Sequence, residues 1–142
     1  MSDQDQRNHP TVLFICTHNA GRSQIAAGYM KALSKGNINA LSAGTAPKDS
    51  INPWVVAAMA EDGIDISSNV PKALDQASIE KSDIVITMGC GESQPIIMNP
   101  LKRHEDWALV NPVGKSLETV RPIRDEIKKL IEKLILEFEV ID

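Results

Sequence analysis

The sequence predicts a single-domain α/β fold with a mainly parallel, four-stranded sheet. Short runs of branched apolar residues alternate with segments of helical periodicity, which is the pattern of a parallel sheet with crossover helices. The strand runs are continuous rather than alternating, as expected for strands covered on both faces. The 142 residues are one domain's length and contain no linker, internal repeat or low-complexity stretch. We expect residues 1–10 to form a flexible polar tail and residues 11–142 to form the domain.

In the first half of that domain, strands and helices alternate. Residues 11–16, TVLFIC, are a short branched and aromatic run and predict a buried strand. Apolar residues at four-residue spacing and several alanines predict a helix over 22–35. A second strand is expected over 38–43. A helix over 53–62 is expected to start with Pro53 in its first turn and Asn52 as its N-cap.

The second half repeats this alternation. We expect a short helix over 76–81 and a buried strand over 83–88, DIVITM. Trp107 to Val110 predict a short fourth strand. The longest helix is expected over 117–138, where an apolar stripe recurs at helical spacing. In open sheets of this kind, ligands bind beyond the carboxyl ends of the strands, so the turns after those ends are the places to look for chemistry.

The composition excludes several functional classes. The net charge of −4 argues against a nucleic-acid partner, and no apolar run is long enough for a membrane span. The polar start MSDQDQRNHP lacks the apolar core of a secretory signal, so we expect a cytoplasmic protein. Two cysteines, Cys16 and Cys90, are too few for a disulfide scaffold or an all-cysteine zinc site. The three histidines are scattered, so no metal site is predicted.

The turn after the first strand carries the strongest chemical signal. Cys16 ends the strand, Arg22 follows six positions later, and a helix begins there. The backbone N–H groups of such a turn can form an anion-binding nest, and the arginine offers a planar fork to a tetrahedral oxyanion. The nest, the helix dipole and the arginine would stabilise a thiolate at Cys16. The predicted oxyanion-binding residues are Thr17, His18, Asn19, Ala20, Gly21, Arg22 and Ser23.

Within this turn, Gly21 and Asn19 suit unusual backbone angles. Ser23 could donate a hydrogen bond to the Cys16 sulfur. His18 could serve as a base, but a loop residue exposed to solvent is the interpretation we favour. The alternative for the whole turn is a buried cysteine that ends a strand beside an arginine that happens to open a helix.

This turn resembles the phosphate-binding loop of the low-molecular-weight protein tyrosine phosphatase fold, and its sequence CTHNAGRSQ resembles the arsenate reductase branch of that family. The resemblance covers about residues 11–138. It implies a four-stranded parallel sheet in the order 2-1-3-4 with helices on both faces. It also implies that the residue matching Cys16 is the nucleophile and that Arg22 is an oxyanion ligand. Its further motifs are SAGT at 42–45, NP at 52–53, GIDIS at 63–67, ITMGCG at 86–91, EDW at 105–107, NPVG at 111–114 and RDEI at 124–127.

Two features favour the reductase over the phosphatase. Phosphatases of this fold usually carry aromatic residues near the site, whereas only 4% of this chain is aromatic and its one tyrosine, Tyr29, has a core position. Cys90 occupies the place of the reductase branch's second cysteine, and its thiolate would attack Cys16 to release arsenite and leave a disulfide. The alternative interpretation is that Cys90 has no redox role and is only a small residue in a glycine-rich loop.

The sequence also departs from the family pattern. Gln94 stands where thioredoxin-coupled members have a third cysteine, so a three-cysteine relay is excluded. Asn111 replaces the usual Asp, the general acid, and an amide cannot transfer a proton. Asp106 is a possible substitute, although we expect it to belong to the fourth strand. Ala26 and Ala27 replace the carboxylate that some members use for potassium, so no strong potassium site is predicted.

The resemblance therefore implies an arsenate reductase with Cys16, Arg22, Cys90 and Asn111 in its active site and no bound cofactor. An external reductant is required, either mycothiol, glutathione or the thioredoxin system, with a thioredoxin- or glutaredoxin-like protein as partner. The expected small ligand is arsenate or phosphate, and the expected state is a monomer. Two alternatives remain open: a tyrosine phosphatase, and an oxyanion-binding relic with little turnover because of Asn111.

Overall fold

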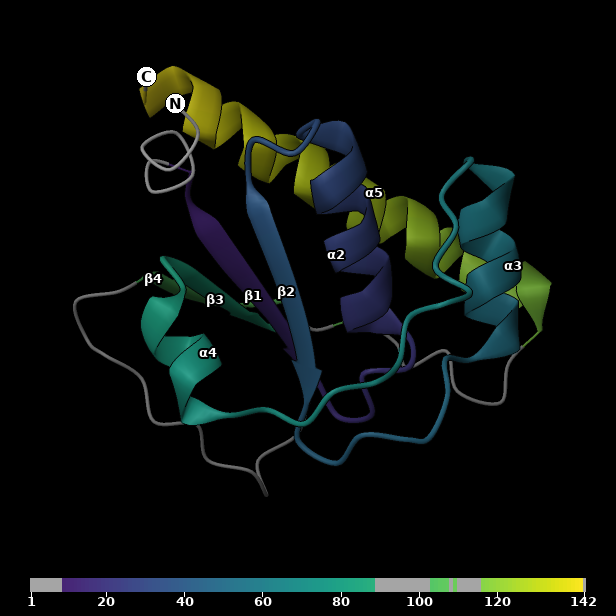
Figure 1. The fold of residues 1–142 in the computed structure, drawn as a ribbon. Coiled ribbons are helices and arrows are strands. Elements are labelled where there is room, and N and C mark those ends of the chain that lie inside the picture. The colour runs from purple at the N-terminus through teal and green to yellow at the C-terminus, as the bar shows by residue number, and fades with distance from the viewer. Residues whose placement is uncertain (1–8, 89–102, 108, 110–115, 142) are drawn as a thin grey trace.

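The computed structural model describes residues 9–88, 103–107, 109 and 116–141 (Figure 1). Four strands form one sheet: β1 (Thr11–Cys16), β2 (Asn39–Gly44), β3 (Ile84–Thr87) and β4 (Arg103–Asp106). Their order is β2-β1-β3-β4, and every neighbouring pair is parallel. The predicted fold class and strand order are confirmed. None of the described helices is long and apolar enough to cross a membrane.

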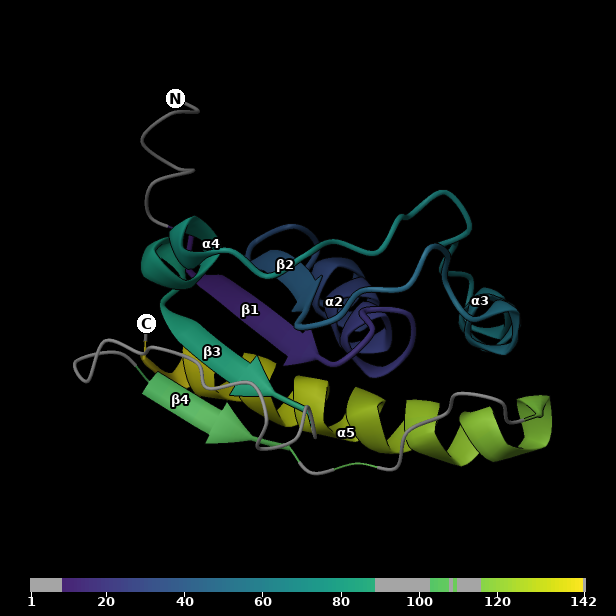
Figure 2. The same cartoon turned by 90° about the horizontal axis from the view of Figure 1, so that it is seen from below.

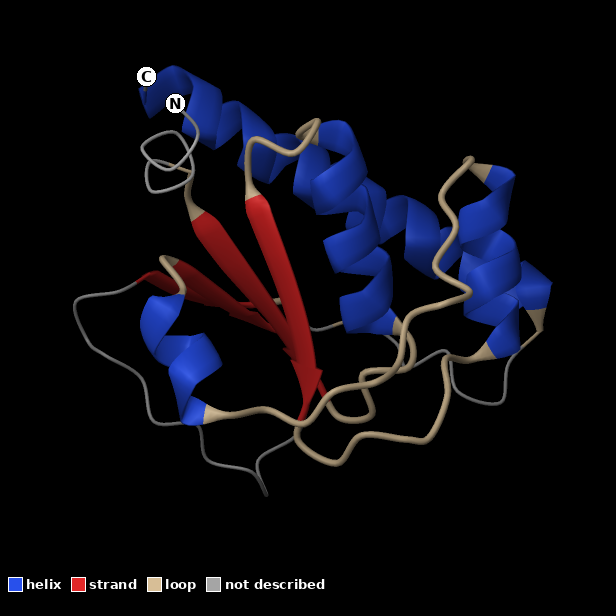
Figure 3. Cartoon of the chain, viewed as in Figure 1, coloured by secondary structure: helices blue, strands red, loops and turns tan. Residues whose placement is uncertain are grey.

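Within the described residues, four helices surround the sheet unequally (Figures 2 and 3). They are α2 (Arg22–Leu33), α3 (Pro53–Glu61), α4 (Gln76–Lys81) and α5 (Leu117–Ile141). The helices α2 and α5 pack against each other over one face, and α3 packs against both of them. The short helix α4 covers the other face beside β1. Helices therefore lie on both faces, as predicted, but most of the core lies on the side of α2 and α5.

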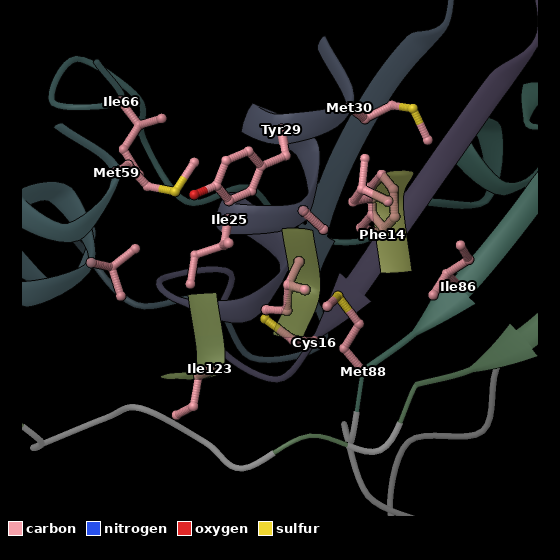
Figure 4. Packing of buried hydrophobic residues seen from close by; sticks show 14 of the residues in the cluster. Phe14, Cys16, Ile25, Tyr29, Met30, Met59, Ile66, Ile86, Met88 and Ile123 are labelled. Carbon is pink, nitrogen blue, oxygen red and sulfur yellow. The ribbon is translucent and has the colours of Figure 1, made fainter. Parts of the chain in front are cut away.

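Alternate residues of β1 divide the core between the two faces. Val12, Phe14 and Cys16 belong to the large cluster under α2, α3 and α5, shown in Figure 4. Leu13 and Ile15 belong to a smaller cluster with Ile79 of α4. This alternation is the period of two that every strand imposes. As a consequence, the Cys16 side chain points toward α2 and α5, at the end of the strand where the chain turns.

Most element boundaries match the expected ones within two residues. The helix predicted over 22–35 ends at Leu33, because Lys35 and Gly36 adopt positive φ values of 56° and 81° and close the helix with a left-handed turn. The helix predicted over 53–62 ends at Glu61, and Asn52 caps its start by accepting a hydrogen bond from the Trp54 amide at 2.9 Å. Tyr29 is 1% exposed, as expected of a core position.

The predicted fourth strand is wrong. Residues 107–110 were expected to form it, but the strand is Arg103–Asp106. This strand lies at the edge of the sheet, where three of its four residues are exposed, and its sequence RHED lacks the apolar run used to find strands. Trp107 follows the strand and packs on Phe14 with ring centroids 6.0 Å apart. Its hydrophobicity therefore marks a core contact beyond the strand end.

Candidate active site

The nucleophile candidate lies at the carboxyl end of the central strand β1. Cys16 is 2% exposed, and the loop 17–21 leads directly into the first turn of α2 at Arg22. The strand has parallel neighbours on both sides, and the connections leave in opposite directions there, to β2 on one side and β3 on the other. Such a switch point is where open α/β sheets bind their ligands. The sheet thus places Cys16 at its binding edge.

The loop's carbonyl groups are turned outward. Four amide N–H groups of the segment 45–52 donate to the carbonyl oxygens of Cys16, Thr17, His18 and Ala20 at 2.7 to 3.2 Å. In contrast, the amide N–H groups of residues 17–21 donate to no group within the described part of the chain. Backbone N–H groups need an acceptor, and a set of them at a helix N-terminus binds an anion. The loop is therefore built as an oxyanion cradle.

Asn19 gives the loop its turn. It adopts the left-handed conformation with φ of 51°, as the sequence predicts. Gly21 is the N-cap residue of α2, and its φ of −143° and ψ of −96° lie outside the regions that residues with a Cβ atom commonly adopt, as the sequence predicts. Among residues 17–22 the left-handed position is thus Asn19, whose side chain is fully buried.

Ser23 meets the expectation that it would contact the sulfur. Its Oγ lies 3.0 Å from Cys16 Sγ in a buried position, and Asn19 Nδ2 donates to the same oxygen at 2.7 Å. Because Asn19 already supplies a proton to Ser23 Oγ, the Ser23 hydroxyl proton is left for the sulfur, and a Cys16 thiolate, which has no proton, can only accept it. A hydrogen bond to sulfur favours the thiolate over the thiol.

Arg22 lies in the first turn of α2, as predicted. Its side chain is 4% exposed, and Nη1 donates to the carbonyl oxygen of Leu109 at 3.2 Å. This bond brings the segment after β4 against the loop. A buried guanidinium beside a ring of N–H groups adds a fixed positive charge to the cradle.

His18 differs from its prediction as an exposed residue. The side chain is half-buried, and its Nδ1 is buried without a hydrogen-bond partner among the described residues. Burial, together with the nearby charges of Lys48 and Arg22, lowers the pKa of His18 below its ordinary value of 6.5. The lowered pKa favours the neutral imidazole at pH 7.

Three predicted positions lie outside the described residues: Cys90, Gln94 and Asn111. Asp106 is described, and it ends β4 as expected. Register pairs Ile15 with Thr87 and Thr87 with Asp106, so these side chains share the face of α4, whereas Cys16 points to the opposite face. Asp106 Oδ1 accepts a hydrogen bond from Thr87 Oγ1 at 2.6 Å. The structure thus turns Asp106 away from the sulfur.

Sequence reasoning missed four residues that support the loop. Gly44 contacts the loop backbone, and Gln24, Asn69 and the amide of Lys72 hydrogen-bond around Asn19. Gly44 and Gln24 do lie in the motifs SAGT and CTHNAGRSQ, so a signal was present for these two. Asn69 and Lys72 belong to a polar, turn-rich segment in which no sequence signal indicates a contact with the loop.

Among the described residues, no three His, Cys, Asp or Glu side chains are grouped to hold a metal ion. The predictions that the chain binds neither a catalytic metal nor potassium are not tested by this observation and stay predictions.

Comparisons with known proteins agree with this geometry. The model of the family "low molecular weight phosphotyrosine protein phosphatase" matches residues 11–140. The chain is 37% identical to the glutaredoxin arsenate reductase of Synechocystis sp., covering 87% of this chain and 95% of that protein. It superposes on the structure of an arsenate reductase in the phosphate-binding state with a TM-score of 0.82 and 36% identity, over 90% of this chain and 98% of that chain.

A further solved relative is the thioredoxin-dependent arsenate reductase of Corynebacterium glutamicum, with a TM-score of 0.80 and 38% identity. The match covers 94% of this chain and 63% of that longer chain. The fold, the loop and the relatives point to one conclusion. The chain belongs to the low molecular weight phosphotyrosine protein phosphatase family and resembles, within it, the members named as arsenate reductases.

Proposed function

We propose that the chain is a thiol-dependent arsenate reductase in which Cys16 is the nucleophile. The observation that carries the chemistry is the loop itself: its carbonyl groups are turned outward, its N–H groups donate to none of the described residues, and Ser23 Oγ lies 3.0 Å from the Cys16 sulfur. The choice of arsenate rests on the relatives, whose names describe arsenate reductases at 35 to 37% identity. The cradle alone would suit phosphate equally well, because the two oxyanions have the same shape and charge.

The reaction begins when the Cys16 thiolate attacks As(V) and an arsenate oxygen leaves as water, forming a sulfur–arsenic bond. The N–H groups of residues 17–21 and the Arg22 guanidinium hold the remaining oxygens. A second thiolate then attacks the Cys16 sulfur. The sulfur–sulfur bond forms, the sulfur–arsenic bond breaks with its electron pair left on arsenic, and arsenic falls from +5 to +3 and leaves as arsenite.

The second thiol is either Cys90 or a low-molecular-weight thiol. With Cys90, the product is a Cys16–Cys90 disulfide that an external reductant must return to thiols. With mycothiol or glutathione, the small thiolate attacks the Cys16 sulfur, arsenite leaves and a mixed disulfide forms. A glutaredoxin-like protein then reduces this disulfide and returns Cys16 to the thiol. The relatives named as glutaredoxin- and thioredoxin-dependent support an external reductant in general. Both routes suit a monomer in the reducing cytoplasm, where free thiols persist.

A phosphatase is the second candidate, favoured by the family description and by the cradle. Hydrolysis of a phosphomonoester requires a proton for the leaving oxygen, and a general acid contributes about 10²–10⁴-fold. Asn111 cannot supply this proton, and Asp106 points to the other face of the sheet. Arsenate reduction depends less on such an acid, so the reductase is the better fit.

The test is an arsenate reduction assay on the wild-type chain with thioredoxin, glutathione–glutaredoxin and mycothiol systems, followed by mass spectrometry of Cys16 and Cys90. We expect reduction with at least one system and no reduction by Cys16→Ser. An internal disulfide identifies the Cys90 route, and a mixed disulfide or thiol adduct identifies the other. Robust hydrolysis of an aryl phosphate without arsenate reduction supports the phosphatase. If both the wild type and Asn111→Asp bind phosphate or arsenate tightly and turn over neither, the chain is a binding relic.

A further inference from the structure

A continuous line of side-chain hydrogen bonds joins the surface to the nucleophile. Asn69 Nδ2 donates to Gln24 Oε1 at 3.1 Å, and Gln24 Nε2 donates to Asn19 Oδ1 at 3.1 Å. Asn19 Nδ2 donates to Ser23 Oγ at 2.7 Å, and Ser23 Oγ lies 3.0 Å from Cys16 Sγ. Asn69 is exposed, while Gln24 and Asn19 are 4% and 0% exposed. We call this series the amide relay.

Two main-chain groups fix the direction of every bond in the amide relay. The Lys72 N–H donates to one terminal atom of the Asn19 amide at 2.8 Å, so that atom must be the oxygen. The Gln24 amide contacts the main-chain carbonyl oxygen of Asn19 at 3.1 Å, so the contacting atom must be its nitrogen. Neither amide can rotate by half a turn without placing two donors or two acceptors face to face.

This fixed direction determines where the Ser23 proton points. Because Asn19 Nδ2 always faces Ser23 Oγ, the serine oxygen accepts there and its single proton remains to be donated to the Cys16 thiolate, which has no proton of its own. If the Asn19 amide reversed, Ser23 would instead donate to Asn19, and the sulfur would lose its donor. Gln24 opposes that reversal, since a reversed Asn19 would present an NH₂ group to the Gln24 NH₂ group.

We propose that Gln24 and Asn69 are positioning residues that keep the Ser23 proton directed at the Cys16 thiolate. Gln24 acts through Asn19, and Asn69 acts through Gln24 by holding its Oε1. Neither residue touches the reacting sulfur. The inference rests on the proposed function only in taking Cys16 as the nucleophile, because the property it concerns is the thiolate fraction of that residue rather than the reduction of arsenate.

The outer half of the amide relay is separate from the oxyanion cradle. Gln24 and Asn69 line a cavity of about 700 Å³ together with residues such as Ser42, Ser68 and Lys72. This cavity lies between α2, β2 and the segment 63–72, and Arg22 is not among the residues that line it. Substitutions there change the hydrogen bonds of Asn19 without altering a group that faces the anion.

The test measures alkylation of Cys16 by iodoacetamide, followed on its own peptide by mass spectrometry at pH 6 and at pH 9.5. Only the thiolate reacts, so the rate at pH 6 reports the thiolate fraction, and the rate at pH 9.5 reports access to the sulfur. In Gln24→Glu, the carboxylate cannot donate to Asn19; in Gln24→Met, a side chain of similar size makes no hydrogen bond. For both variants we expect a rate at pH 6 lower by about five- to tenfold and a rate at pH 9.5 within about twofold of wild type.

Asn69→Ala should lower the pH 6 rate by about two- to threefold, because Gln24 keeps its bond to the Asn19 main chain. The matched controls are Gln76→Glu and Asn37→Ala, which make the same changes at exposed positions of α4 and of the turn after α2 and should match wild type at both pH values. Equal slowing at both pH values would show a change of access and would overturn the inference. An unchanged alkylation rate at pH 6 in both Gln24→Met and Asn69→Ala would also overturn it, whether or not Gln24→Glu folds.

If the variants lose alkylation rate at pH 6 but the wild-type chain reduces no arsenate, the proposed function is refuted and the inference about the amide relay is retained.

Discussion

A Cβ atom on Gly44 would lie 2.8 Å from the carbonyl oxygen of Thr17 and 2.9 Å from the amide nitrogen of Asn19. Gly44 ends β2 in register with Cys16, so the last residue of one strand supports the loop that follows its neighbour. Both contacting atoms belong to the backbone, which cannot move aside as the end of a side chain can. The loop therefore keeps its shape only if position 44 carries no side chain.

Gly44→Ala is expected to destabilise the fold by about 1–3 kcal/mol, the usual cost of overpacking a well-filled site. It should also weaken phosphate binding, because the displaced atoms belong to the cradle. Urea denaturation and phosphate titration calorimetry measure the two effects. Gly28→Ala is the matched control: its Cβ would meet the movable end of Met59 at 3.0 Å, and alanine favours a helix. Gly28→Ala should stay within about 1 kcal/mol of wild type, and equal costs for the two variants would contradict the argument.

Arg22→Lys should keep the positive charge but lose the planar fork, and phosphate affinity should fall by about 10- to 100-fold. The Arg22 side chain is 4% exposed, so water cannot replace the hydrogen bonds that are lost when a lysine ammonium takes the place of the guanidinium. Titration calorimetry with phosphate measures the loss. Arg121→Lys is the control, since Arg121 lies on α5 and forms an exposed ion pair with Glu61 of α3. Unchanged phosphate affinity in Arg22→Lys would show that the guanidinium fork does not bind the oxyanion.

Asp106→Asn should leave arsenate reduction within about twofold of wild type at every pH from 6 to 9, because a general acid would contribute far more, about 10²–10⁴-fold. The reason is geometric: Asp106 shares the α4 face with Thr87, opposite the face of Cys16. Asparagine also retains the oxygen that accepts the Thr87 hydroxyl. Steady-state rates with the reductant found active for wild type are the measurement. A hundredfold loss would identify Asp106 as the acid that replaces Asn111.

The elements that could be predicted are those whose residues carry a local physical signal. The run over 11–16 has no polar residue inside it, and Asn52-Pro53 has the cap and first-turn residues of a helix start. The loop was equally readable, because Cys16, Arg22 and Ser23 are close in sequence. Its Ser23–Cys16 contact spans only seven residues.

The rest depends on contacts between distant segments. Strand β4 lies at an exposed edge, so its residues need no apolar run, and pairing with β3 alone makes them a strand. The bond from Asn69 to Gln24 spans 45 residues, and the Lys72 amide reaches Asn19 across 53. No local pattern in the segment 63–72 indicates either bond. His18 is half-buried for a similar reason, since Lys48 and its neighbours fold over the loop.

Acid should weaken the fold through Glu61, which joins α3 to α5 by accepting hydrogen bonds from Arg121 at 2.6 Å and Arg124 at 2.7 Å. The hydrogen bonds to Arg121 and Arg124 lower the pKa of Glu61 from its ordinary value of 4.5 to about 2. Because the folded pKa lies below the unfolded one, the carboxylate stabilises the fold above about pH 4.5, and this contribution is lost as the pH falls toward 2.

Urea denaturation from pH 7 to pH 3 should show that wild type is more stable than Glu61→Gln at neutral pH and that this difference in stability shrinks below pH 4.5. Added salt should shrink the neutral-pH difference as well, because the pair is exposed. The control is Glu132→Gln, at an exposed position of α5, and its stability difference from wild type should not shrink below pH 4.5. A difference between wild type and Glu61→Gln that stays constant with pH would contradict the role of Glu61.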